Sequence, residues 1–212
     1  MPRVLMNEHI LMAKFILGKK LGMSQIFDQT GNEIPVTLIE AGPCFITQIK
    51  TKDKDGYESI QIGFIKKDKK IKKTEKGKEF RYLKEFSAQG GPASGWKIGD
   101  EINVSSFQEG DKVKVSGISK GKGFAGAVKK EGVHGKNKTH GTKHEERQTG
   151  STGPSQPSRV TKGVKMAGRM GHERASVKNV KIAKIDQENN IIAVKGAVPG
   201  AKGTLLEIQS QS

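Results

Sequence analysis

The residues whose types and spacing could do chemistry gather in the second half of the chain. The run 121–126, Gly-Lys-Gly-Phe-Ala-Gly, fits the GxGxxG pattern of a dinucleotide-binding loop after a probable strand. Such a fold would next need a helix, a second parallel strand and an acidic residue about 20 positions further on. The sequence that follows is instead rich in glycine and lysine, and Gly123 stands where a Walker loop requires Ser or Thr. We therefore expect no nucleotide cofactor and no small-molecule substrate.

Histidine and serine side chains in the same region also lack the partners that catalysis needs. His140 and His144 lie four residues apart, a spacing that on a helix lets two imidazoles share a metal ion. Gly141 between them disfavours a helix, and no cysteine or HExxH glutamate completes a ligand set. Ser119 and Ser151 have no evident base and orienting acid. We expect no metal and no enzymatic activity, and a base-stacking or phosphate-contacting role for the histidines.

With nucleotide, metal and nucleophilic sites set aside, positive charge is the property of this chain that most clearly indicates a function. The formal net charge is +16, and two windows hold all of it. Residues 66–84 carry ten Lys/Arg against three acidic residues, and residues 117–174 carry thirteen against four, while the rest is neutral. Charge gathered in this way favours a polyanionic partner, nucleic acid before an anionic membrane surface. No apolar stretch approaches the roughly 20 residues of a membrane span, so we expect no membrane partner.

The second window combines this charge with twelve glycines and few large apolar residues. Lysine and arginine bring positive charge to phosphates, arginine can also grip them bidentately, and glycine lets the backbone approach closely. An extension ordered by RNA and a disordered linker both fit this composition; the strands that resume beyond Arg174 favour the extension. The candidate RNA contacts are Lys120, Lys122, Lys129, Lys130, Lys136, Lys138, His140, Lys143, Arg147, Arg159, Lys162, Lys165, Arg169 and Arg174.

Short alternating segments on both sides of this window predict the elements that position it. The expected strands are 34–39, 44–50, 57–64, 98–104, 111–116, 175–185, 191–194 and 205–208. Short strands separated by regular turn signals are typical of a small barrel. No segment has a convincing long helical period. We therefore predict a mainly β protein: a small β-barrel body with a long, irregular Gly/Lys-rich extension and minor helix content.

Composition suggests four parts along the chain. Residues 1–11 form an N-terminal extension, because Met12 is an alternative start to Met1. Residues 12–118 form the first part of the barrel body with a basic loop at 66–84, residues 119–174 form the extended loop, and residues 175–212 complete the body. For 66–84, a solvated loop and direct RNA contact both stay open. The single cysteine, Cys44, excludes an intramolecular disulfide and fits a cytosolic protein.

Several runs of sequence resemble the bacterial large-subunit ribosomal protein L3 family. They are Phe107, 116–126 (SGISKGKGFAG), 139–141 (THG), Arg147, 150–153 (GSTG), 165–174 (KMAGRMGHER), 194–200 (VKGAVPG) and, near the start, 18–27 (GKKLGMSQIF). The resemblance spans about residues 12–208, and several long motifs in the same order make it specific.

This resemblance implies a β-barrel body on the large ribosomal subunit and a long loop that runs through rRNA toward the peptidyl transferase centre. It also implies direct binding to 23S rRNA early in assembly, neighbouring large-subunit proteins as further partners, a cytoplasmic location and no catalysis. A general RNA-binding or chaperone module outside the ribosome would share the composition, but not the order of the motifs.

Some positions depart from the family pattern. Lys114 replaces the usual Asp or Asn, Lys130 an Arg, Glu146 a His, and His172 an Asn. Some bacterial members carry a methylated glutamine after the Gly-Ser-Ile-Gly stretch, where this chain has Pro154. The modification is therefore not carried over, and Gln156 stays an alternative site.

Overall fold

The computed structural model describes residues 14–67, 71–75, 77–87, 96–156 and 158–211. The predicted N-terminal extension, residues 1–11, lies outside the described residues. By its contacts the chain divides into two compact units. We call the unit that runs up to Ile118 and resumes at Arg174 the body, and residues 119–173 the extension; each is described by itself.

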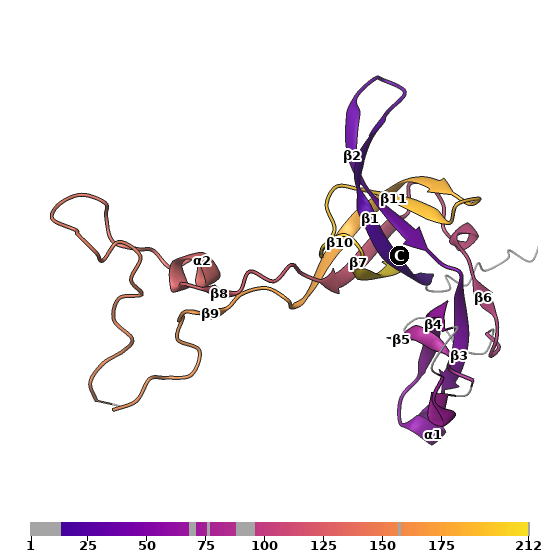
Figure 1. The fold of residues 1–212 in the computed structure, drawn as a ribbon, viewed down its shortest axis with the longest axis horizontal. Coiled ribbons are helices and arrows are strands. Elements are labelled where there is room, and N and C mark those ends of the chain that lie inside the picture. The colour runs from indigo at the N-terminus through magenta and orange to yellow at the C-terminus, as the bar shows by residue number, and fades with distance from the viewer. Residues whose placement is uncertain (1–13, 68–70, 76, 88–95, 157, 212) are drawn as a thin grey trace, which may run out of the picture. The chain divides into compact units, whose positions relative to one another are not determined.

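Six strands of the body close into an antiparallel barrel in the order β1-β12-β7-β10-β11-β2 (Figure 1). The strands are β1 (Phe15–Phe27), β2 (Glu33–Ala41), β7 (Lys112–Ile118), β10 (Arg174–Asp186), β11 (Ile191–Lys195) and β12 (Leu205–Ser210). Their side chains alternate between interior and exterior: in β7, Val113 and Val115 are buried while Lys112 is exposed. Closure pairs every strand on both sides, so this sheet has no free edge.

A second, four-stranded sheet in the body has the order β5-β4-β3-β6. It contains β3 (Cys44–Lys50), β4 (Ser59–Lys66), β5 (Phe80–Ser87) and β6 (Glu101–Ile102). A short helix, α1 (Lys52–Asp55), joins β3 to β4, and 3-10 turns cover Lys73–Glu75 and Val104–Ser106.

One hydrophobic core holds both sheets together. Ile16, Leu17, Ile39, Ile192 and Ile208 have no exposed surface, and the same cluster continues through the four-stranded sheet to Phe86. The rings of Phe15 and Phe86 stack with centroids 4.8 Å apart, which joins the barrel to that sheet. Burying such a side chain stabilises the fold by about 1.5–3 kcal/mol. The body therefore holds its shape by apolar burial.

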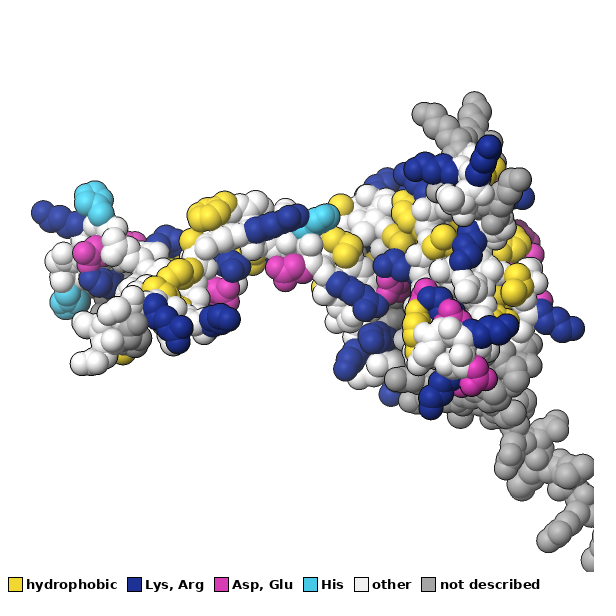
Figure 2. Space-filling view, turned by 90° about the horizontal axis from the view of Figure 1, so that it is seen from below, with side chains coloured by type: hydrophobic (Ala, Val, Ile, Leu, Met, Phe, Trp, Pro, Cys, Tyr) yellow, Lys and Arg dark blue, Asp and Glu magenta, His cyan; other side chains and the backbone are white. Residues whose placement is uncertain are grey.

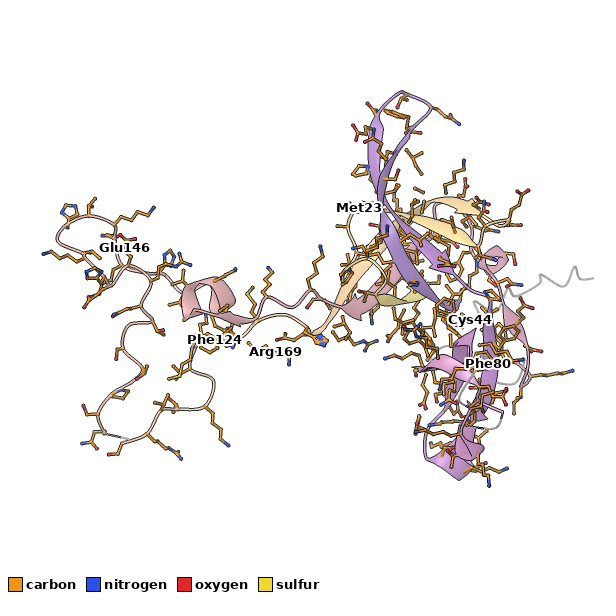
Figure 3. The ribbon with its side chains drawn as sticks, viewed as in Figure 1. Met23, Cys44, Phe80, Phe124, Glu146 and Arg169 are labelled. Carbon is orange, nitrogen blue, oxygen red and sulfur yellow. The ribbon has the colours of Figure 1, made fainter. Side chains whose placement is uncertain are left out.

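The glycine at position 63 lets an aromatic ring lie directly on the four-stranded sheet. A Cβ atom at Gly63 would lie 2.4 Å from the ring of Phe80, closer than any side chain can approach. Phe80 (labelled in Figure 3) also stacks on Phe45, with centroids 5.7 Å apart. A strand thus begins at residue 80, inside a segment rich in lysine.

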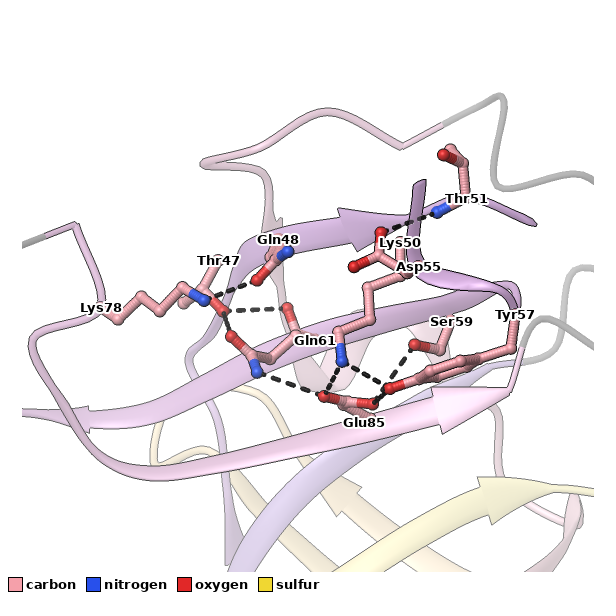
Figure 4. A network of polar contacts seen from close by, with 10 residues as sticks. All are labelled: Thr47, Gln48, Lys50, Thr51, Asp55, Tyr57, Ser59, Gln61, Lys78 and Glu85. Atoms are coloured by element: carbon pink, nitrogen blue, oxygen red, sulfur yellow. Dashed lines mark hydrogen bonds and ion pairs between the residues drawn. The ribbon is translucent and has the colours of Figure 1, made fainter. Parts of the chain in front are cut away.

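A polar network joins three parts of this sheet around the carboxylate of Glu85 (Figure 4). The Lys50 ammonium lies 2.7 Å from Glu85 Oε1, and the hydroxyl of Tyr57 donates to Glu85 Oε2 at 2.8 Å. Ser59 and Gln61 donate weaker hydrogen bonds to the same carboxylate at 3.4 Å. These donors, Lys50 first, lower the pKa of Glu85 below its ordinary value. With four donors around its two oxygens, the carboxylate ties the sheet together.

The predicted fold class, mainly β with a small barrel body and minor helix content, is confirmed. Within the body the details differ in three places. Strand β1 was not predicted, the expected strand 98–104 is reduced to β6, and strand β5 begins within the expected basic loop 66–84. Residues 34–118 therefore supply a separate sheet as well as barrel strands.

Candidate nucleic-acid interface

The extension has almost no interior. Among its described residues, only Ala125 and Ala127 are buried, and none of the core cluster comes from this unit. It carries twelve Lys/Arg against four Glu, a net charge of +8 in 55 residues. Apolar burial therefore cannot be what holds this segment in one conformation.

A short two-stranded ladder forms the base of the extension. The Ser119 N–H donates to the carbonyl of Glu173, and the Lys122 N–H to that of Met170, each at 2.9 Å. Beyond them β8 (Phe124–Ala125) pairs with β9 (Gly168–Arg169). Gly171 has a φ of +73°, and a Cβ there would lie 2.2 Å from the carbonyl oxygen of Lys120. The ladder therefore depends on glycine at position 171.

A single helical turn supports one face of this ladder. Helix α2 (Ala127–Glu131) follows β8 and ends at Gly132, whose φ is +64°. The N–H groups of Lys129 and Lys130 donate to the Gly126 carbonyl at 3.1 and 2.9 Å. The Lys130 ammonium pairs with Glu131 at 3.0 Å and lies beside Gly168.

Between residues 132 and 167 the described chain contains no helix or strand. One close backbone approach occurs there: the Lys136 N–H donates to the Glu146 carbonyl at 3.0 Å, and a Cβ at Gly135 would lie 1.9 Å from that same oxygen. Lys136 also pairs with Glu145. Figure 3 shows Glu146 in this irregular part of the extension. Its few internal hydrogen bonds leave most backbone groups of this region free for other partners.

The predicted contact residues are nearly all open to solvent. Thirteen of the fourteen are exposed, and Lys130 is half-buried. Lys130, Lys136 and Arg174 have acidic partners, whereas the other eleven form no ion pair within the described part of the chain. Arg174 is the first residue of β10 and pairs with Glu207, so it belongs to the body. Figure 2 shows lysine and arginine side chains projecting from the surface of the extension.

Sequence reasoning missed two surface features, an exposed aromatic ring in the extension and a group of lysines on the body. Phe124, in β8, has 81% of its surface exposed. On the body, Lys178, Lys181 and Lys195 line a hollow and form no ion pair in the described ranges. Lys181 also lies opposite Lys112 on β7, a repulsive pairing of like charges. The alternation of β10 and β11 hid these lysines, because outward lysines are ordinary in a half-buried strand.

The structure offers little support for catalytic or metal chemistry. The GxGxxG run contains β8 and leads into the five-residue helix α2, and no parallel strand follows it in the described extension. His140 has a φ of +60° and is not helical, and no group of three potential metal ligands occurs among the described residues. Burial raises the pKa of the Cys44 thiol to about 12, so it stays protonated and unreactive. No helix in the described ranges is long and apolar enough to cross a membrane.

Comparisons with known proteins found a matching family model and several relatives. A family model described as Ribosomal protein L3 matches residues 97–190. Large ribosomal subunit protein uL3 of Herpetosiphon aurantiacus is 47% identical over 201 residues, covering 91% of this chain and 94% of the relative. The uL3 protein of Carboxydothermus hydrogenoformans is 47% identical over 206 residues (93% and 97%), and that of Thermosipho africanus is 48% identical over 205 residues (93% and 98%).

Proposed function

The chain belongs to the ribosomal protein L3 family, and we propose that its extension binds 23S rRNA directly as part of the large ribosomal subunit. The protein is a structural rather than a catalytic component of the large subunit, located in the cytoplasmic ribosome. From the family resemblance we further infer that it binds early in assembly, that the extension reaches toward the peptidyl transferase centre, and that neighbouring large-subunit proteins contact the body.

One observation carries this proposal: the extension has a net charge of +8 and only two buried residues among those described. Ordering such a chain costs about 1–2 kcal/mol per residue in backbone entropy, which its own packing cannot offset. Phosphates that approach from several sides would supply the missing interactions through charge-assisted hydrogen bonds. The extension would then take its final conformation from the RNA that surrounds it.

The body would contribute a second, smaller contact. Lys178, Lys181 and Lys195 present three charges around one hollow of the barrel wall, and none of them has an ion-pair partner among the described residues. An RNA phosphate there would relieve the repulsion between Lys181 and Lys112. We infer that the barrel docks on folded rRNA through this surface while the extension neutralises phosphates elsewhere.

The salt dependence of 23S rRNA binding tests the contacts assigned to the extension. Each neutralised phosphate releases counterions, so the logarithm of affinity falls with the logarithm of salt concentration, with a slope of about 0.7–0.9 per contact. Replacing Lys120, Lys122 and Lys165 by Gln removes three such contacts. We expect weaker binding and a slope flatter by about 2–3, measured by filter binding between about 50 and about 200 mM salt.

A matched variant controls for the loss of charge alone. Replacing Lys52, Lys54 and Lys97 by Gln removes three exposed charges from the body, away from the proposed contacts, and should leave the slope unchanged. A slope equal to wild type in the extension variant would contradict the assignment. Equal affinity for unrelated RNA, or loss from large subunits during a high-salt wash, would instead favour a general RNA-binding module.

A further inference from the structure

Phe124 is exposed in a way that the fold does not explain. Its side chain is 81% exposed, against 63% for Phe27 and 57% for Met23 on the body. It has no ring or cation contact in the described part of the chain, whereas four of the eleven aromatic residues of the chain are buried in the core cluster. Leaving a phenyl ring in water forgoes about 1.5–3 kcal/mol of burial. A partner that covered the ring would recover this free energy.

The backbone around Phe124 is the most regular part of the extension. In the β8–β9 ladder Phe124 pairs with Arg169, and Ala125 pairs with Gly168. Ala125, the next residue of β8, is 5% exposed and faces inward, opposite to Phe124. Ala127 of the adjoining helix α2 is 2% exposed. The ladder is extended by hydrogen bonds of 2.9 Å between Lys122 and Met170 and between Met170 and Gly123. Phe124 therefore projects from a hydrogen-bonded strand pair and not from an irregular loop.

The register also fixes the neighbour of the ring. Residues directly opposite in an antiparallel pair project from the same face, with Cβ atoms about 4.5–5.5 Å apart. Figure 3 shows Phe124 and Arg169 on the two adjoining strands. Arg169 is exposed and forms no ion pair in the described ranges. An open aromatic face and an unpaired guanidinium thus lie side by side.

We propose that Phe124 is a stacking platform for an unpaired RNA base, with Arg169 holding a phosphate of the same or the adjacent nucleotide. A nucleotide is flat and apolar at its base and anionic at its phosphate, which matches this pair of side chains. An apolar protein surface would match the ring but would leave the guanidinium without a partner. The proposal rests on the function proposed above and adds a contact in which one base is held by its face.

The test separates stacking from charge by using the full-length protein and 23S rRNA. The substitution Phe124→Leu keeps an apolar side chain but removes the ring, and we expect it to weaken binding about tenfold or more. Because no charge is lost, the salt slope should not change. Phe124→Trp keeps a stacking face and should bind within about threefold of wild type.

Phe27→Leu is the matched control, because it removes an exposed ring from β1 on the body. It should bind rRNA like wild type. A direct readout comes from Phe124→Trp in a Trp96→Phe background, which leaves one tryptophan at the proposed platform. Base stacking should quench its fluorescence when 23S rRNA is added.

Binding of Phe124→Leu at wild-type affinity, or unquenched tryptophan in the bound complex, would overturn the stacking proposal while leaving rRNA binding intact. If Phe124→Leu weakens incorporation into subunits but not binding to protein-free rRNA, the ring contacts a protein and the proposal is wrong. If the wild-type protein does not bind 23S rRNA, the function proposed above fails first.

Discussion

The body and the extension of this chain hold their shape by different means. The body closes six strands around Ile, Leu and Val side chains with no exposed surface, and a second sheet shares the same core. The extension buries two alanines among its described residues and carries three times as many basic as acidic side chains. The contrast teaches that one chain can combine a region held by its own hydrophobic core with a segment that has almost no core and an unbalanced positive charge.

Glycine serves the two regions in a similar way, although the surroundings differ. In the body, Gly63 makes room for the ring of Phe80 within a packed sheet. In the extension, Gly135 and Gly171 make room for backbone carbonyls where no core exists. In the extension, close contacts between backbone segments thus take the place of side-chain packing.

The largest expected effect comes from removing a core side chain. Ile192 in β11 has no exposed surface, so Ile192→Ala should lower the free energy of unfolding by about 2–5 kcal/mol, measured by urea denaturation. Val160 in the extension is 50% exposed, and Val160→Ala should change the free energy of unfolding by no more than about 0.5 kcal/mol. Comparable losses at both positions would show that the extension has a core of its own.

A smaller and local effect is expected at the base of the extension. Gly171→Ala places a Cβ atom at a residue with a φ of +73° and 2.2 Å from the Lys120 carbonyl oxygen. This strain should destabilise the ladder by about 1–3 kcal/mol. Hydrogen exchange at the amides of Lys122 and Met170 should accelerate, because both are bonded in that ladder.

The matched control is Gly126→Ala, at a position with ordinary backbone geometry and no atom within 4 Å of a Cβ. It should leave those amides protected. The midpoint of urea unfolding of the body should be the same in both variants. A lower midpoint for the body in Gly171→Ala would mean that the two units do not hold their shape independently.

The smallest effect is expected at the Glu85 network of the body. The Lys50 ammonium and the Tyr57 hydroxyl lower the pKa of Glu85 in the folded protein below its unfolded value of about 4.3. The stabilisation is therefore present above the unfolded pKa and is lost as the pH falls through the folded pKa. Because the Glu85 side chain keeps 33% of its surface in contact with solvent, the pair is partly screened, and Glu85→Gln should lower the Tm at neutral pH by at most about 2–4 °C.

That difference from wild type should shrink as the pH falls below the unfolded pKa and through the lowered pKa of the folded carboxylate, because the wild-type side chain then becomes protonated. Glu58→Gln provides the control, since Glu58 is exposed and has no ion pair in the described ranges. A Tm difference for Glu85→Gln that stays constant from neutral to acid pH would show that the network does not act through the charge of Glu85.

Much of the fold and of the candidate interface could be predicted because it depends on local pattern. The alternation in 44–50, 111–116 and 175–185 indicated strands, and β3, β7 and β10 are found there. The clustering of glycine and lysine in 117–174 indicated a segment without a core, and the described extension has almost none. Strand β5 was missed because lysines surround the alternation of Phe80, Tyr82 and Phe86, so the charge of the segment obscured its apolar face.

The amino-acid sequence by itself determined which segments can bury apolar side chains and which carry unbalanced charge, because both properties follow from residue type and local spacing. Only the tertiary structure decided which strands pair, that six of them close while four others form a separate sheet, and that Phe124 is left open beside Arg169. The reason is physical: whether an apolar side chain is buried depends on what lies across from it, and those neighbours come from distant parts of the chain.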